Sequence, residues 1–308
     1  MFALILFVSL ACANEAAFKQ WAAAHNKVFA NRAEYLYRFA VFLDNKKFVE
    51  ANANTELNVF ADMTHEEFIQ THLGMTYEIP ETTPSVKAAI KAAPESVDWR
   101  SIMNPAKDQG QCGSCWTFCT TAVLEGRVNK DLGKLYSFSE QQLVDCDSSD
   151  NGCEGGHPSN SLKFIQENNG LGLETDYPYK AVAGTCKKVK NVATVTGSKR
   201  VTDGSETGLQ TIIAENGPVA VGMDASRPSF QLYKKGTIYS DAKCRSRMMN
   251  HCVTAVGYGS NSNGKYWIIR NSWGTAWGDA GYFLLARDSN NMCGIGRDSN
   301  YPTGVKLL

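Results

Sequence analysis

The positions of the cysteines constrain this chain more than any other feature of its sequence. The chain has 308 residues and ten cysteines, nine of which follow residue 100, at positions 112, 115, 119, 146, 153, 186, 244, 252 and 293. The tenth, Cys12, stands alone near the N-terminus. An odd number of cysteines leaves at least one thiol without a partner in its own chain. We therefore expect a cross-linked C-terminal part that keeps a free thiol, after a cysteine-poor N-terminal part.

The first thirteen residues have the pattern of a secretory signal peptide. An apolar run over residues 2–10 is followed by the small residues Ala11, Cys12 and Ala13. Such a run is too short to cross about 30 Å of hydrocarbon as a helix, but it is typical of a signal that is removed during secretion. We predict cleavage after Ala13, with residues 1–13 as the signal. The alternative is a buried N-terminal helix or strand of a cytosolic protein.

The secretory route also bears on the cysteines and on the destination of the protein. A membrane-spanning helix needs about 18 consecutive apolar residues, and no later segment comes close to that length, so no membrane span is expected. An oxidising compartment makes disulfides the default state for most of the nine later cysteines. The product is expected either outside the cell or in a lysosome-like acidic vesicle.

Charge and composition exclude several classes of protein. The chain carries 31 basic and 31 acidic side chains, so its formal net charge is zero. A nucleic-acid or anionic-membrane binder would show a basic excess, and neither partner is expected. Apolar residues make up 43% and charged residues 20%, which is ordinary for a globular protein. The length suggests about two domains.

The N-terminal part reads as helical. Apolar residues recur at helical spacing over residues 16–54, and Asn31 with Glu34 three residues later has the pattern of an N-cap and its reciprocal partner. A shorter helix is predicted to begin at Thr64, with Glu67 completing a capping box. Residues 77–93 are rich in Thr, Pro, Ala and Lys without an apolar period, and we expect them to form an exposed linker.

After residue 94 helices are followed by strands. Helices are predicted over residues 115–129, 139–145, 158–169 and 205–216, and strands over 219–223, 251–258, 266–270 and 282–286. Helices first and strands later indicate an α+β protein with two lobes.

Three residues in this part have the chemistry and spacing of a nucleophilic site. Cys115 lies in the first turn of a predicted helix, where unpaired amides and the helix dipole favour a thiolate. A thiolate needs an acid-base partner that is held in orientation. His251 follows 136 residues later and Asn271 another twenty residues on, separations close to those of papain-type cysteine proteases.

The chain resembles the papain and cathepsin L family of cysteine endopeptidases over almost its whole length. The string Cys-Gly-Ser-Cys-Trp at 112–116 and Asn-Ser-Trp-Gly at 271–274 match its two catalytic motifs. Residues 34, 38, 42, 45 and 49 resemble the helical pattern of cathepsin L-like propeptides, and residues 58–62 resemble the second propeptide motif. The string at 94–100 is similar to the start of mature papain-like chains, so maturation is expected near Ala93.

This resemblance implies the domain organisation and the activity. Residues 14–93 would form a helical inhibitory propeptide, and residues 94–308 a papain-like peptidase with a helical lobe at about 94–205 and a β-barrel-like lobe at about 206–308. The enzyme would be made as a zymogen and would hydrolyse peptide bonds through a thioacyl-enzyme, without a cofactor or a metal. Its partners would be protein and peptide substrates, its own propeptide and cystatin-like inhibitors, and it would be a monomer.

The resemblance also assigns roles within the site. Cys115 would attack the scissile carbonyl, His251 would form the ion pair and act as general acid, and Asn271 would orient the imidazole. Gln109 would supply a side-chain donor to the oxyanion hole. Trp273 would cover the bond between His251 and Asn271 and exclude water.

Disulfide pairing is implied by the resemblance as well. The pairs would be Cys112 with Cys153, Cys146 with Cys186, and Cys244 with Cys293. Cys115 would be free. Cys119 and Cys252 would remain as small buried packing residues.

Substrate choice would depend on the pocket for the side chain two residues before the cut bond. Gly155 and Gly156 would line the cleft through backbone hydrogen bonds. The pocket would comprise His157, Pro158, Gly222, Met249 and, at its base, Asp298. A carboxylate in that place pairs with a guanidinium, so we expect a preference for arginine. The alternative is that Asp298 faces solvent.

Acidification is expected to release the propeptide. Its acidic residues include Asp62 and Glu66, and protonation of paired carboxylates would weaken its docking.

Three other functions fit some of the same residues. Cys112 and Cys115 also form a C-x-x-C motif, which indicates a thiol-disulfide oxidoreductase, but the expected βαβ setting is absent from the pattern. A zinc site would need Cys112, Cys115, Cys146 and His157, without the second ligand pair of a zinc finger. A catalytically inactive binding homologue would usually lack the nucleophile.

Overall fold

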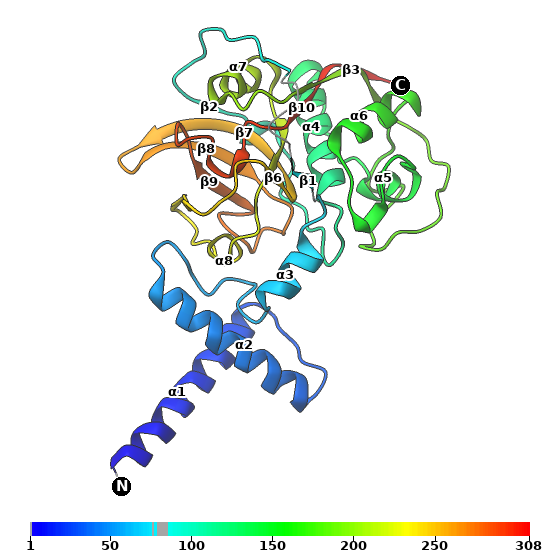
Figure 1. Cartoon of the computed structure of the whole chain (residues 1–308). Coiled ribbons are helices and arrows are strands. Elements are labelled where there is room, and N and C mark those ends of the chain that lie inside the picture. Colours follow the sequence, from blue (N-terminus) through cyan, green and yellow to red (C-terminus); the bar gives the residue numbers. More distant parts are fainter. Residues whose placement is uncertain (1, 76, 79–85) are drawn as a thin grey trace.

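The computed structural model describes residues 2–75, 77–78 and 86–308. An N-terminal helical unit lies on one side of a larger body, which consists of a helical lobe and a β lobe (Figure 1). The predicted α+β class is confirmed. Within the described residues, no helix is both long and apolar enough to cross a membrane.

The N-terminal unit contains three helices, α1 (Phe2–Ala24), α2 (Arg32–Ala51) and α3 (His65–His72). The long helix expected over residues 16–54 is therefore divided in two. The division falls where the sequence placed a cap, because Asn31 accepts the amide of Glu34 at 3.0 Å. The capping box predicted at the start of α3 is present. Helix α1 continues through the expected signal cleavage point.

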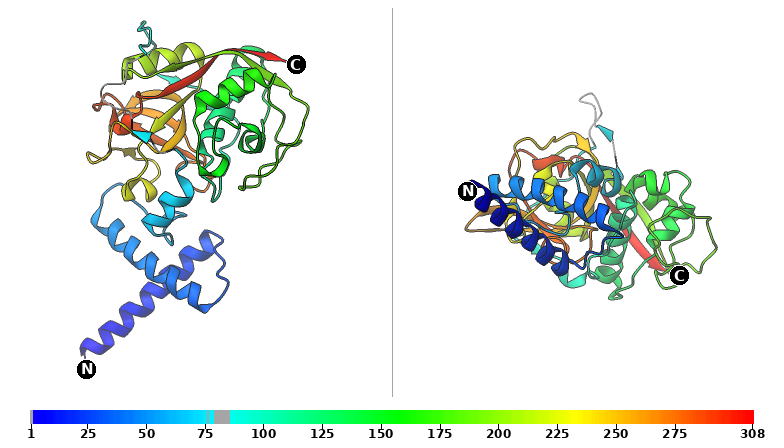
Figure 2. Two further views of the ribbon diagram at one scale, coloured as in Figure 1. Left: turned by 45° about the vertical axis from the view of Figure 1, so that its right-hand side comes forward. Right: turned by 90° about the horizontal axis from the view of Figure 1, so that it is seen from below.

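An aromatic core holds this unit together and docks it to the β lobe. Helices α1 and α2 cross each other next to the larger body (Figures 1 and 2). Phe18, Trp21 and Phe42 are buried at the crossing, together with Leu232 of the body. Asn58 adds a polar contact, because its side-chain amide donates to the Gln231 carbonyl at 2.8 Å. The unit is thus anchored on the C-terminal end of the short helix α8 (Pro228–Gln231) of the β lobe.

The helical lobe is built around α4 (Cys115–Leu132), which is buried along most of its length. Helices α5 (Glu140–Cys146) and α6 (Pro158–Glu167) lie beside it, together with the short 3-10 helices η1 (Arg100–Ile102) and η2 (Gly152–Glu154). Burying α4 fixes the position of its first residue, the proposed nucleophile.

The β lobe contains a sheet with strand order β3-β10-β4-β7-β8-β9-β5, and β2 pairs with β7 off this path. Its strands are β2 (Val97–Asp98), β3 (Ala193–Val201), β4 (Val219–Met223), β5 (Ile238–Tyr239), β7 (His251–Asn261), β8 (Gly264–Arg270), β9 (Tyr282–Ala286) and β10 (Ser299–Leu307). The expected barrel-like lobe is thus an open sheet, because its path does not close on itself. Helices α7 (Glu206–Asn216) and α8 (Pro228–Gln231) and the 3-10 helix η3 (Met292–Gly294) complete the lobe.

Strands β3 and β10 were not predicted from the sequence. They pair antiparallel along almost their full length. Strand β10 contains Pro302, which cannot donate to a ladder, and the register shifts between Pro302 and Gly304. The first residues of β3 and the last residues of β10 pack against the helical lobe, so this ribbon joins the two lobes.

The linker expected over residues 77–93 is ordered at its start. Strand β1 (Tyr77–Glu78) pairs antiparallel with β6 (Met248–Met249) of the body. The segment at 79–85 lies outside the described residues. From Val86 the chain follows β3 and α7, where Lys91 forms an ion pair with Glu215 at 2.7 Å.

The structure contains the three expected disulfides and a fourth, Cys119–Cys252. We expected these last two residues to be unbonded packing residues, and that expectation is wrong. Both residues are buried, as expected. However, the packing of α4 on β7 brings their Cα atoms to 6.0 Å from each other, a distance at which a disulfide can form. Cys115 is a free buried thiol.

Candidate active site

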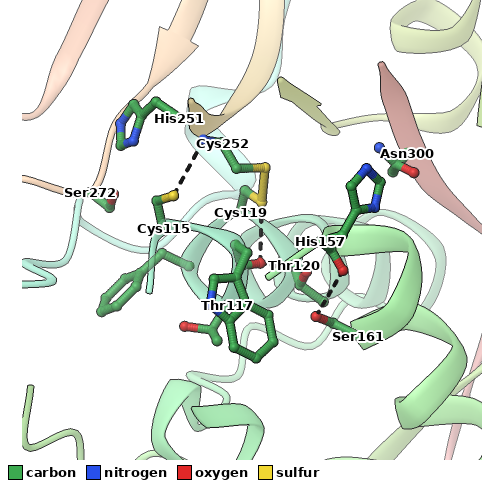
Figure 3. The surroundings of a disulfide bond; sticks show 12 residues. Cys115, Thr117, Cys119, Thr120, His157, Ser161, His251, Cys252, Ser272 and Asn300 are labelled. Carbon is green, nitrogen blue, oxygen red and sulfur yellow. Dashed lines mark hydrogen bonds between the residues drawn. A yellow bond between two sulfur atoms is a disulfide. The ribbon is translucent and has the colours of Figure 1, made fainter. Parts of the chain in front are cut away.

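Cys115 lies at the first position of α4, at the boundary of the two lobes. Its side chain is fully buried. The amide of Cys252 on β7 points at its sulfur, with a nitrogen–sulfur distance of 3.5 Å. Figure 3 shows the thiol below the His251 ring, with the Cys119–Cys252 disulfide to one side. Helix α4 and strand β7 therefore bring the proposed nucleophile and the proposed base together.

Asn271 fixes the orientation of the His251 ring. Its side-chain oxygen accepts the backbone amide of Ser272 at 2.9 Å and also contacts His251 Nε2 at 2.8 Å. An oxygen can only accept, so the neutral ring carries its proton on Nε2. Nδ1 then has a free lone pair, and it has no hydrogen-bond partner in the described part of the chain. This is the state that can accept a proton from a thiol.

Trp273 covers the imidazole. The two rings stack with centroids 4.8 Å apart and an interplanar angle of 25°, and Trp273 itself is buried. Among its other ring contacts, Phe60 and Phe68 of the N-terminal unit pack edge-on against it. The indole therefore shields the bond between His251 and Asn271 from water.

Gln109 presents an amide donor to a peptide carbonyl. Its side-chain oxygen accepts the Ser272 hydroxyl at 2.6 Å, which leaves the amide nitrogen to donate. That nitrogen reaches the carbonyl oxygen of His72, the last residue of α3, at 3.2 Å, and that of Cys112 at 2.9 Å. The side chain is thus aimed at a carbonyl that lies in the cleft.

Burial keeps the two reactive groups neutral in this structure. Removal from water raises the pKa of the Cys115 thiol to about 11 and lowers the pKa of the His251 imidazole to about 4. The sequence predicted a thiol made acidic by the helix N-terminus. Desolvation outweighs that effect here, since α3 and the segment that follows it cover the site. A thiolate–imidazolium pair therefore requires that the cover be removed.

The segment that follows α3 occupies the cleft with its backbone. The Gly156 amide donates to the Gly74 carbonyl at 3.1 Å, and the Met75 amide donates to the Asn250 carbonyl at 3.2 Å. A side chain at position 74 could not fit, because a Cβ there would lie 1.7 Å from the Gly113 carbonyl oxygen. Gly155 has the same constraint, with a Cβ placed 2.4 Å from the Gly74 oxygen. Glycines on both sides therefore permit this close approach.

The residues expected in the specificity pocket gather at the edge of this cleft. Pro158 is the first residue of α6, and Gly222, on β4, lies under Met249 and Asp298. Asp298 is fully buried, so the alternative that it faces solvent is wrong. Its carboxylate contacts His157 Nε2 at 2.7 Å.

Sequence reasoning missed three further groups around Asp298. Tyr77 on β1 directs its hydroxyl at the carboxylate. Arg200 on β3 donates to it at 2.9 Å and Asn300 on β10 at 3.0 Å. Desolvation raises the pKa of Asp298 to about 7. The separation of 98 residues between Arg200 and Asp298 left no local signal for this pair.

The geometry does not support the redox and zinc alternatives. Cys112 is bonded to Cys153, so the C-x-x-C motif contains one disulfide partner and one separate thiol. No cluster of three or more His, Cys, Asp or Glu side chains suited to a metal was found among the described residues.

The fold and the site agree with the comparisons to known proteins. Residues 93–303 match the papain family of cysteine proteases, and residues 18–68 match the cathepsin propeptide inhibitor domain. The chain therefore belongs to the papain family. It is a cysteine protease, a hydrolase that carries its own inhibitory propeptide as a zymogen.

Among individual relatives, the chain is 96% identical over 308 residues to Cysteine proteinase 3 of Entamoeba histolytica, and the match covers all of both chains. It is 40% identical to Digestive cysteine proteinase 1 of Homarus americanus, over 98% of each chain. A solved structure of a recombinant stem bromelain precursor superposes with a TM-score of 0.86 at 37% identity, covering 95% of this chain and 99% of the other. A digestive procathepsin L 3 of Tenebrio molitor larval midgut gives 0.83 at 35% identity, with 94% and 98% covered.

Proposed function

We propose that Cys115, His251, Asn271 and Gln109 are the catalytic residues of a cysteine endopeptidase. One observation carries this assignment: a free thiol lies beside an imidazole whose unprotonated Nδ1 is held available by Asn271. Gln109 supports it, because its amide already donates to a peptide carbonyl in the cleft.

The reaction begins when the propeptide leaves and water reaches the site. The thiol proton of Cys115 passes to His251 Nδ1, and the sulfur attacks the scissile carbonyl carbon. Gln109 donates to the oxygen that becomes negative. His251 then protonates the leaving amine, which leaves a thioacyl-enzyme that water hydrolyses with the same imidazole as base.

The segment boundaries remain proposals. Residues 1–13 are a signal peptide, residues 14–93 the inhibitory propeptide and residues 94–308 the mature enzyme. The protein enters the secretory pathway and is either exported or kept in an acidic vesicle, where low pH weakens propeptide docking. It acts as a monomer on protein and peptide substrates and is open to cystatin-like inhibitors.

Asp298 gives the enzyme a preference for arginine two residues before the cut bond. A buried carboxylate at the base of a pocket favours a donor or a cation over an apolar side chain. The pocket also contains His157, Pro158, Gly222 and Met249. Asp298→Asn should lower the turnover of an arginine substrate relative to a phenylalanine substrate, and an unchanged ratio in a peptide library would overturn this assignment.

Active-site labelling tests the nucleophile directly. The activated enzyme is titrated with an epoxide thiol inhibitor, and the labelled residue is found by mass mapping. Label on Cys115 alone is expected, with none on a Cys115→Ser variant. The unreacted zymogen is the control, because its covered, neutral thiol should label slowly. Label at another cysteine, or peptidase activity in Cys115→Ser, would refute the proposal.

A further inference from the structure

We propose that Arg200 is a specificity-determining residue, which makes the pocket accept tyrosine and limits its preference for arginine. This inference rests on the pocket described under the proposed function. It concerns a residue of β3 that lies outside the motifs of the family and that contacts the base of the pocket.

Arg200 occupies one of the two carboxylate oxygens of Asp298. Its Nε donates to Oδ1 at 2.9 Å, and Asn300 donates to the same oxygen at 3.0 Å. The two donors are fixed by the sheet, because Asn300 on β10 and Arg200 on β3 are direct cross-strand partners. Oδ1 is therefore committed to the protein itself.

His157 partly occupies the other oxygen. Its Nδ1 accepts the backbone amide of Ser159 at 3.1 Å, so the neutral ring carries its proton on Nε2. Nε2 then donates to Asp298 Oδ2 at 2.7 Å. One acceptor direction remains on Oδ2, and a substrate side chain must use that direction.

In the zymogen a phenol fills this remaining place. The Tyr77 hydroxyl donates to Asp298 Oδ2 and lies 3.3 Å from Arg200 Nη2, from which it can accept. A phenol both donates and accepts, so it satisfies Asp298 and Arg200 together. The pocket is thus already shaped and charged for a tyrosine side chain.

An arginine side chain of a substrate interacts less favourably with Asp298 and Arg200 than a tyrosine side chain does. A guanidinium has five donors and no acceptor, so it can pair with Oδ2 but offers nothing to Arg200. The usual two-bond fork to a carboxylate is also excluded, because Oδ1 is taken. In addition the two guanidinium groups repel each other. Arg200 therefore weakens the selection of arginine that Asp298 alone would give.

The test compares mature wild-type enzyme with Arg200→Met and with Lys199→Met. Lys199 is the exposed neighbour on β3, so its loss removes the same charge without touching the pocket. Three fluorogenic dipeptides differ only in carrying Arg, Tyr or Phe two residues before the cut bond. Active-site titration with the epoxide normalises each kcat/KM to correctly folded enzyme.

In wild-type enzyme the tyrosine substrate should exceed the phenylalanine substrate about fivefold in kcat/KM, as expected for one gained hydrogen-bonding group. Arg200→Met should raise the Arg-to-Tyr ratio about tenfold, the scale of one like charge removed from a partly exposed position. Lys199→Met should leave the ratio within twofold. Arg200→Lys keeps the charge and should stay near wild type, and it provides a measurement if the methionine variant fails to fold.

The possible failures are distinguishable. If Arg200→Met leaves the Arg-to-Tyr ratio of kcat/KM unchanged, the inference about Arg200 is wrong. The pocket proposal still stands in that case if Asp298→Asn lowers kcat/KM for the Arg and Tyr substrates relative to the Phe substrate. If Asp298→Asn also changes nothing, the pocket proposal itself is wrong. An equal change in Lys199→Met would show a general charge effect and would also overturn the inference.

Discussion

Replacing both Cys119 and Cys252 with alanine removes the disulfide that joins α4 to β7 beside the proposed nucleophile. The bond closes a stretch of 133 residues, for which the chain-entropy estimate is about 5 kcal/mol. The other three disulfides already shorten the path between these positions in the unfolded chain. We therefore expect the free energy of unfolding to fall by about 4 kcal/mol.

The matched control removes the Cys146–Cys186 disulfide, which closes 40 residues within the helical lobe. Urea unfolding without reductant is measured on zymogens that also carry Cys115→Ser, so that they cannot cleave themselves. The control should lose about 3–4 kcal/mol. The two variants should differ in catalysis, since only the Cys119–Cys252 bond connects the elements that carry Cys115 and His251.

Catalysis is measured on the corresponding mature enzymes with Cys115 intact. Removing the Cys119–Cys252 bond should lower kcat about tenfold or more with little change in KM, because small misplacements of reacting groups are costly. The Cys146–Cys186 variant should keep its kcat. A stability loss below about 1 kcal/mol, an unchanged kcat, or alkylation of both thiols in unreduced wild-type protein would refute the reasoning.

Three further changes test the zymogen and the core. Burial lowers the pKa of His72 to about 4, so the neutral imidazole stabilises propeptide docking fully above about pH 6.5. The free energy of docking should weaken by about 3 kcal/mol as the pH falls towards 4. His72→Phe should therefore make the self-processing rate less dependent on pH over that range. Gly74→Ala should raise the residual peptidase activity of the zymogen about tenfold, because overpacking weakens docking, and activity equal to wild type would contradict the close approach. Lys107→Met leaves the buried Glu140 unpaired and should cost about 3–5 kcal/mol in urea unfolding; a loss under 1 kcal/mol would contradict the ion pair.

The parts of the fold with local signals were predictable from the sequence. Asn31 and Thr64 cap helices through side chains that bond to amides three residues later, so the pattern lies within a few positions. Strands β4 and β9 have the predicted bounds, because continuous apolar runs mark them. The proposed catalytic residues also follow from motif and spacing.

The rest depended on contacts between distant segments. Strands β3 and β10 stabilise each other through pairing, while their own sequences contain glycine, lysine and a proline that argue against strands. The Cys119–Cys252 bond requires the packing of α4 on β7. Arg200 reaches Asp298 through the same β3–β10 ribbon. These pairs of residues come together only when the whole domain has folded.

The β3–β10 ribbon also has a consequence for folding during synthesis. Strand β10 follows every other described element along the chain, yet it lies between β3 and β4 in the sheet and its end packs on the helical lobe. Until this strand has been synthesised, neither lobe can complete its packing. The helical propeptide has by then been made in full. Helix α3 is therefore available before the site that it covers can form.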